Sequence, residues 1–101
     1  MSNFEWDENK NRSNQQKHGI PFEEAKDVFD DDNAVAYPGH DKDGENRILL
    51  VGKTLGRFII AVVFTMRKQI YRIISARQAR KEEVRDYIAN KFQNLDDESG
   101  N

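Results

Sequence analysis

The sequence contains no cysteine, so it can form neither a disulfide nor a zinc–thiolate site, and it offers no cysteine nucleophile. No apolar run approaches the roughly 18 residues that a membrane-spanning helix needs. The N-terminal segment is polar and carries no visible secretory signal, so we expect a cytoplasmic protein. At 101 residues, the chain is long enough for one core. We expect a compact domain over residues 1–92 and a disordered acidic tail over residues 93–101.

Carboxylates are missing from residues 47–81, although the whole chain carries 18 acidic and 16 basic residues. Residues 1–46 hold 5 basic and 12 acidic residues, whereas residues 47–91 hold 11 basic and 3 acidic ones. Such segregation favours an anionic partner, which would bind the basic half of the chain. The two histidines, His18 and His40, do not have the spacing of a helical metal site, so we expect neither a metal nor another cofactor.

The carboxylate-free stretch contains the most strand-like part of the sequence. Two apolar runs, Phe58–Met66 and Ile70–Ala76, are rich in β-branched and aromatic residues and predict two strands. The break between them, Met66–Gln69, contains neither glycine nor an Asn-Gly pair, so the pattern predicts a four-residue loop rather than a two-residue turn. The expected product is an antiparallel hairpin with cationic margins.

Further elements are predicted on both sides of this hairpin. They are an edge strand at Phe4–Trp6, a helix over Glu8–His18 between Asp7 as N-cap and Gly19 as C′, a short helix over Pro21–Phe29, strands over Ala34–Tyr37 and Arg47–Val51, and a helix over about Ala79–Phe92. Phe22, Ala25, Val28 and Phe29 predict an apolar stripe on the short helix. The stripe formed by Val84, Tyr87, Ile88 and Phe92 predicts that the last helix packs on the sheet. The fold class is therefore α+β, with short N-terminal helices, an antiparallel sheet of three to four strands or more, and a C-terminal helix packed on that sheet.

Four arginines at or near the hairpin ends are candidates for ligand binding, namely Arg57, Arg67, Arg72 and Arg77. Their guanidinium groups match phosphate oxygens bidentately, and no carboxylate lies near them in sequence, so we expect a phosphate-bearing ligand. The alternative is that they are solvated cations that keep the sheet soluble. His18 fits a helix C-terminus and His40 a polar loop, whereas Tyr87 fits the apolar face of the last helix.

Several motifs taken together resemble the toxins of the BrnT family. The N-terminal ones are Phe4-Glu5-Trp6-Asp7, Asn14, Lys17-His18-Gly19, Phe22-Glu23-Glu24-Ala25 and Val28-Phe29-Asp30-Asp31, and the C-terminal ones are Arg72-Ile73-Ile74-Ser75-Ala76-Arg77, Ala79, Glu83 and Tyr87. They occur in the family's order from Phe4 to about Tyr87. Two positions depart from the family, since Pro21 stands where a serine is frequent and Met66 where a glutamate is frequent.

The resemblance implies a fold like that of RelE toxins and a metal-independent endoribonuclease that inhibits translation. It also implies a BrnA-type antitoxin as partner, contact with DNA only through that antitoxin, and no membrane association; a dimer within the toxin–antitoxin complex stays open. Cleavage would follow attack of a 2′-OH on the adjacent phosphorus, which needs a base, an acid and cations.

The resemblance implies five catalytic candidates: Arg67, Arg72 and Arg77 as cations, His18 as base and Tyr87 as acid. Lys53, Arg57 and Lys68 would contact the RNA backbone. Two other readings stay open: a non-catalytic nucleic-acid-binding module, and a protein-interaction module whose basic sheet face binds an acidic partner.

Overall fold

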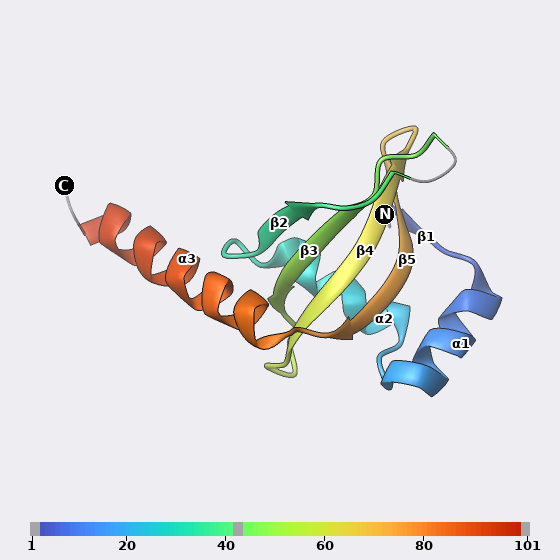
Figure 1. Ribbon diagram of the computed structural model, residues 1–101, viewed down its shortest axis with the longest axis horizontal. Coiled ribbons are helices and arrows are strands. Elements are labelled where there is room, and N and C mark those ends of the chain that lie inside the picture. Colours follow the sequence, from blue (N-terminus) through green and yellow to red (C-terminus); the bar gives the residue numbers. More distant parts are fainter. Residues whose placement is uncertain (1–2, 42–43, 100–101) are drawn as a thin grey trace.

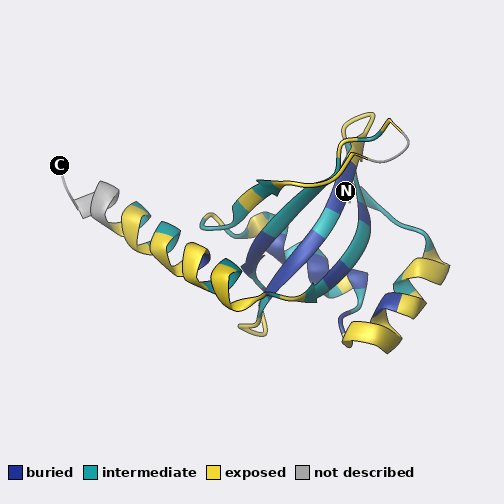
Figure 2. Cartoon of the chain, viewed as in Figure 1, coloured by how far each residue is buried: buried dark blue, intermediate teal, exposed yellow. Residues whose placement is uncertain are grey.

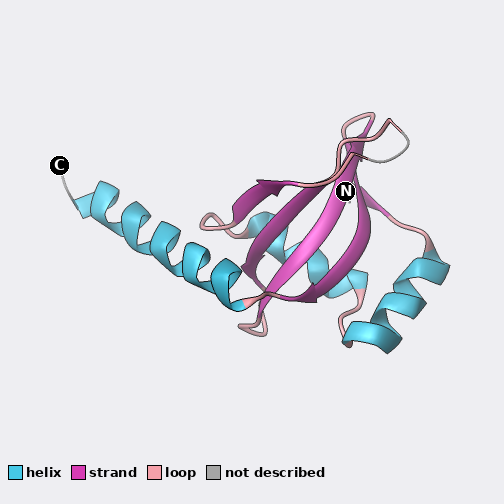
Figure 3. Ribbon diagram, viewed as in Figure 1, coloured by secondary structure: helices cyan, strands magenta, loops and turns pink. Residues whose placement is uncertain are grey.

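The computed structural model describes residues 3–41 and 44–99, with only the backbone described for residues 96–99. Its elements, in chain order, are β1 (Phe4–Glu5), α1 (Glu8–His18), α2 (Phe22–Ala25), the 3-10 helix η1 (Lys26–Asp30), β2 (Val35–Pro38), β3 (Ile48–Lys53), β4 (Ile59–Arg67), β5 (Ile70–Gln78) and α3 (Lys81–Ser99). The strands form one sheet in the order β1-β5-β4-β3-β2 (Figures 1 and 3). The predicted α+β class is confirmed.

The central hairpin differs from its prediction in its turn. Arg67 pairs directly with Ile70, so only Lys68 and Gln69 form the turn, and the predicted four-residue loop is wrong. Both turn residues have positive φ, at 50° and 68°. A two-residue turn with two left-handed residues matches the twist of the strands, and this match outweighs the absence of glycine. The sheet is also not wholly antiparallel, because β1 runs parallel to β5 with Phe4 beside Tyr71.

One face of the sheet is covered by the N-terminal helices. In Figure 1, α2 lies behind the sheet while most of the front face is open. The stripe predicted for this segment is confirmed, because Phe22, Ala25 and Val28 are completely buried. They pack with buried residues of the neighbouring loop and strands, namely Ile20, Ile60, Val62, Ile73 and Ala76. Burial of this apolar surface is the main stabilising contribution to the domain.

Helix α1 has almost no apolar residues and is attached to the sheet by one polar side chain. Asn14 is 7% exposed, and its amide nitrogen donates to the carbonyls of Ile20 and Ala76, at 3.0 and 2.8 Å. Its amide oxygen accepts from the backbone nitrogen of Ala76 at 3.1 Å. β1 pairs with β5 only beside Tyr71 and Arg72, so Asn14 satisfies both backbone groups of Ala76 at a point that β1 does not reach.

Helix α3 contacts the sheet mainly through its first turns. Tyr87 is 3% exposed and packs with Val51 and Ala61 on the front face. Ile88 and Phe92 are 43% and 64% exposed, so the predicted packing of the whole stripe is wrong for these two residues. The helix extends away from the sheet and is exposed along most of its described length (Figures 1 and 2).

Helix α3 also runs further than predicted, to Ser99. Residues 93–99, expected in a disordered tail, are therefore helical, because the acidic tail residues are compatible with a helix and no breaker occurs before Gly100. Residues 100–101 of that tail lie outside the described residues, and the domain boundary at residue 92 stays a prediction. Among the described residues, no helix is long and apolar enough to cross a membrane.

Candidate active site

Three of the four arginines predicted at the hairpin are paired with carboxylates, contrary to the prediction. Arg67 contacts Glu45 at 2.6 Å, and Arg72 contacts Glu5 at 3.0 Å. Arg77 contacts Glu83 at 2.8 Å. The interpretation of these side chains as unpaired cations is therefore wrong. The carboxylates come from segments before and after the acid-free stretch, and the fold brings them beside the arginines.

Arg77 and two arginines that were not predicted, Arg47 and Arg80, line a groove on the front face of the sheet. We call this feature, of about 370 Å³, the arginine groove; it is lined by Pro38, Gly39, His40, Arg47, Leu49, Val63, Arg77 and Arg80. Its floor is made by β3, β4 and β5, and its sides by the loop after β2 and by the residue preceding α3. Of the predicted catalytic residues, only Arg77 lies in this groove.

Arg77 is held in a fixed orientation at the end of β5. Its Nη1 donates to Oε1 of Glu83 at 2.8 Å and its Nη2 donates to Oε2 at 3.0 Å. Nη1 also donates to the carbonyl of Gln78 at 3.1 Å. The hydrogen bonds from Arg77 lower the pKa of the Glu83 carboxyl, and the same contact raises the pKa of the guanidinium. Both side chains stay charged over a wide pH range, so the cation at the groove is permanent.

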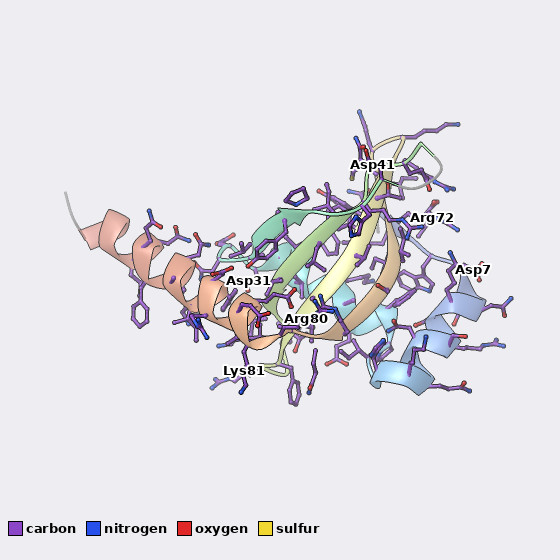
Figure 4. The ribbon with its side chains drawn as sticks, in the orientation of Figure 1. Asp7, Asp31, Asp41, Arg72, Arg80 and Lys81 are labelled. Carbon is purple, nitrogen blue, oxygen red and sulfur yellow. The ribbon has the colours of Figure 1, made fainter. Side chains whose placement is uncertain are left out.

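Arg80 directs a second cation toward the groove. It precedes α3, and its backbone nitrogen donates to Oε1 of Glu83 at 2.8 Å, as the N-cap residue of a capping box does. Its side chain extends over the front face of the sheet (Figure 4). In the described structure, no carboxylate forms an ion pair with Arg80. One glutamate therefore orients both Arg77 and the backbone of Arg80 at the start of α3.

Arg47 brings a third cation from the segment before β3. Its Nε is buried and has no hydrogen-bond partner among the described residues. The neighbouring backbone is close-packed, because the nitrogen of Gly39 donates to the carbonyl oxygen of Arg47 at 2.8 Å. A Cβ added at Gly39 would lie 2.6 Å from that oxygen, so this position requires glycine. Burying a donor without an acceptor is unfavourable, which makes an external anion a suitable partner for Arg47.

His40 is the one histidine among the described residues that line the arginine groove. It is exposed in the loop after β2, and it lines the groove together with Arg47 and Arg80. An imidazole can accept and donate protons near neutral pH, which makes His40 a candidate base. His40 was not among the predicted catalytic residues, because its loop is polar and no motif includes it.

The other predicted catalytic residues lie elsewhere. His18 is exposed at the end of α1, beside a separate pocket that contains the core residue Ile60. Arg72 lies on the β5 side of the sheet, apart from Arg80 in Figure 4, and Arg67 lies at the hairpin turn. The structure does not bring these three residues together with Arg77, and their catalytic roles stay predictions.

Tyr87 is in a position that stabilises the fold. Its hydroxyl donates to Oδ2 of Asp31 at 2.7 Å, and the same oxygen accepts from the backbone nitrogen of Lys53 at 2.8 Å. Burial, together with the hydrogen bond to Asp31, raises the pKa of the Tyr87 phenol far above its usual range. Asp31 therefore joins η1, β3 and α3. A proton donor near neutral pH needs a lower pKa than this phenol has.

The predicted RNA-binding residues are spread over the two turns of the sheet. Lys53 ends β3 and lies in a pocket with Asp27, Asp30 and Asp31. Arg57 is exposed with φ at 70° in the β3–β4 turn, and Lys68 is exposed in the β4–β5 turn. Their contact with RNA stays a prediction. The described residues contain no group of three or more histidine or acidic side chains that could hold a metal ion.

A comparison with protein families matches residues 6–83 to the family described as the ribonuclease toxin BrnT of type II toxin–antitoxin systems. The chain belongs to this family. Its structure is similar to the 1.1 Å crystal structure of the ribonuclease toxin BrnT from Brucella abortus, with 27% sequence identity and a TM-score of 0.64. That match covers 80% of this chain and 100% of the Brucella chain. No curated protein sequence matches the chain.

The general class of this chain is therefore that of the ribonuclease toxins of type II toxin–antitoxin systems. The resemblance read from the sequence is thereby confirmed. The matched region ends at Glu83, so it includes the groove residues His40, Arg47, Arg77 and Arg80. Most of α3 lies beyond it.

Proposed function

We propose that this chain is a metal-independent endoribonuclease whose RNA-cleaving site is the arginine groove. The observation that carries this proposal is the composition of the groove. One arginine, Arg77, is oriented by a bidentate carboxylate, while Arg47 and Arg80 form no ion pair with the carboxylates of the described chain. The groove thus has an excess of positive charge on rigid elements, which suits a phosphodiester.

In the proposed reaction, the 2′-oxygen of one nucleotide attacks the adjacent phosphorus and the 5′-oxygen of the next nucleotide leaves. His40 takes the 2′-proton, and the leaving oxygen gains a proton from solvent. The products are a 2′,3′-cyclic phosphate and a 5′-OH end. The guanidinium groups of Arg47, Arg77 and Arg80 donate to the phosphorane oxygens, where negative charge increases in the transition state.

The test uses a defined RNA in the presence of EDTA, with detection of cyclic-phosphate ends. His40→Ala should reduce cleavage by about 10²-fold or more, as expected on loss of a general base. The matched control is His18→Ala, which removes the histidine outside the groove and should reduce cleavage far less than His40→Ala. An RNA with a 2′-deoxynucleotide at the cleaved position should be resistant. Wild-type binding of RNA without any cleavage would overturn the proposal and favour the non-catalytic binding module.

A second test compares two arginines that are close in sequence, Arg80 just before α3 and Arg85 within it. Arg80→Ala should lower cleavage strongly, whereas Arg85→Ala, an exposed residue outside the groove, should not. Equal loss in both variants would mean that general charge attraction, and not the groove, carries the activity.

The proposed partner is a small BrnA-type antitoxin that covers the basic sheet face from Arg67 to Arg77 and represses their shared operon through its own DNA-binding region. Free ribonuclease activity would be harmful to the cell, so the cationic face has to be masked. Co-expression should give a stable complex without ribonuclease activity. A complex that cleaves RNA at the full rate of the free toxin would refute masking of the site.

A further inference from the structure

A second pocket lies at the same end of β5 as the arginine groove, on the side of the sheet that carries α2. We call it the Phe58 pocket; its volume is about 240 Å³, and its apolar side chains are Ile20, Phe58 and Ile60. Three polar side chains, His18, Glu24 and Gln78, also line it. This volume is below the roughly 300–1,000 Å³ of sites for drug-sized ligands, so it suits a small planar group.

Phe58 has the properties of a stacking platform. Its side chain is 60% exposed, although aromatic side chains of this size are usually buried. The backbone around it is fixed, because its nitrogen donates to Oγ1 of Thr54 at 3.2 Å and its carbonyl accepts from the nitrogen of Thr54 at 2.9 Å. An exposed aromatic ring on a rigid turn can stack on a nucleobase, and such stacking is a main mode of single-stranded RNA recognition.

Glu24 supplies the chemistry that selects a base. Its neighbour Glu23 pairs with Lys26 at 2.8 Å, but the half-buried Glu24 has no ion-pair or hydrogen-bond partner for its carboxylate in the described structure. An ionised carboxylate only accepts hydrogen bonds. Guanine presents two adjacent donors on one edge, N1–H and the 2-amino group, which a carboxylate can accept together. Gln78 and His18 can donate to the guanine O6.

The chain connects this pocket directly to the proposed cleavage site. Gln78 lines the pocket and Arg77 lines the groove, and the Arg77 guanidinium donates to the Gln78 carbonyl at 3.1 Å. We propose that the Phe58 pocket binds a guanine base of the RNA strand whose phosphate lies at Arg77, stacked on Phe58 and recognised by Glu24. This inference rests on the proposed function, because it assigns the groove's substrate a base preference.

Base binding can be tested separately from cleavage. Wild-type protein is titrated with guanosine, inosine and cytidine 5′-monophosphates, and backbone amide shifts around Phe58 and Gln78 are followed by NMR. Guanosine monophosphate should bind tightest. Inosine monophosphate lacks only the 2-amino group and should bind about tenfold more weakly, in the range of a lost bidentate contact. Glu24→Gln should remove the difference between the two, and the matched control Glu23→Gln should preserve it.

Cleavage then shows whether the pocket acts on the substrate. Wild-type protein should prefer steps that contain guanine in an RNA with all dinucleotide steps. Glu24→Gln should abolish this preference, and the control Glu23→Gln should preserve it. Phe58→Leu should weaken guanosine binding but retain the inosine difference. Equal binding of all three nucleotides, or an unchanged preference in Glu24→Gln, overturns the inference even when RNA is cleaved. Guanosine binding that depends on Glu24 in a protein that cleaves no RNA would support the base pocket and refute only the proposed function.

Discussion

Arg77 at the end of β5 and Glu83 in the first turn of α3 are joined by two parallel hydrogen bonds of 2.8 and 3.0 Å. The same carboxylate accepts from the backbone nitrogen of Arg80 at 2.8 Å. Glu83 is thus a positioning residue, since it fixes the plane of the Arg77 guanidinium and the start of the helix that follows. The same arginine lines the arginine groove.

Loss of the planar guanidinium should impair catalysis even when the charge is kept. We expect Arg77→Lys and Arg77→Ala to lose cleavage by on the order of 10²-fold or more, because a lysine cannot donate two parallel hydrogen bonds to phosphate oxygens. Steady-state and single-turnover rates on a short RNA measure the effect. The control is Lys68→Ala, an exposed turn cation that should weaken RNA binding only slightly.

These arginine variants should also be destabilised. The Arg77 side chain is 25% exposed and that of Glu83 12%, so replacement leaves a mostly buried carboxylate with a weaker partner. A loss of about 1–3 kcal/mol in unfolding free energy is expected for Arg77→Ala. Wild-type cleavage rates with weaker RNA binding would make Arg77 a backbone-binding residue, and a failure to fold would make it a structural one.

The ion pair predicts a pH dependence of stability. The hydrogen bonds from Arg77 lower the pKa of Glu83 in the folded protein below its ordinary value of 4.5. Its stabilising contribution is therefore complete above pH 4.5 and is lost as the pH falls through the lower folded pKa. When the pH falls from neutrality to below 4.5, the unfolding free energy of Glu83→Gln should decrease less than that of wild type. Glu45→Gln is the comparison, and its effect should be smaller because that pair is exposed to solvent.

The local elements of the fold were predictable because their signals are contiguous in the sequence. Asp7 caps α1 through hydrogen bonds from the backbone nitrogens of Asn9 and Lys10, and Gly19 ends the helix with φ at 73°, both as expected. The stripe of Phe22, Ala25 and Val28 identified the buried face of the next segment. In each case, a few adjacent residues determine the local energetics.

The candidate site was not predictable to the same extent, because its residues come from three separate segments. His40 lies in the loop after β2 and Arg47 directly precedes β3, whereas Arg77 lies near the end of β5 and Arg80 directly precedes α3. Only the sheet order places these segments side by side. The basic bias of residues 47–91 was the available signal for Arg47 and Arg80. That bias does not distinguish arginines with remote carboxylate partners from arginines without one.

Tyr87 is expected to stabilise the protein without taking part in cleavage. Tyr87→Phe removes the hydrogen bond to Asp31 but keeps the ring that packs against Val51 and Ala61. We expect a loss of about 1 kcal/mol in unfolding free energy, because Asp31 retains its backbone donors from Asn33 and Lys53. Cleavage by the folded variant should equal that of wild type. A loss of cleavage by 10²-fold with unchanged stability would restore the catalytic reading of this tyrosine.

The exposure of Ile88 on α3 predicts that its substitution has a small effect on stability, although the apolar stripe in the sequence suggested that this residue is buried. Ile88 is 43% exposed, so Ile88→Ala should cost less than about 1 kcal/mol. Ile60 is 1% exposed in the core, and Ile60→Ala should cost about 2–5 kcal/mol. Urea unfolding midpoints compare the two variants directly. Equal destabilisation would mean that Ile88 is buried in solution and that α3 lies on the body of the protein.

The attachment of α1 depends on Asn14. Asn14→Ala should cost about 2–4 kcal/mol in unfolding free energy, because it leaves both backbone groups of Ala76 without their partner. The control on the same helix is the exposed Gln16→Ala, which should change stability by less than about 0.5 kcal/mol.

Asn14→Asp is the sharper variant. It keeps an acceptor for the Ala76 nitrogen, but it replaces the amide nitrogen that donates to two carbonyls with a carboxylate oxygen. It should destabilise at least as much as alanine at neutral pH, and hydrogen exchange should accelerate first in α1 and at Ala76. An aspartate variant as stable as wild type would show that the amide donor, and with it this attachment of α1, is not needed in solution.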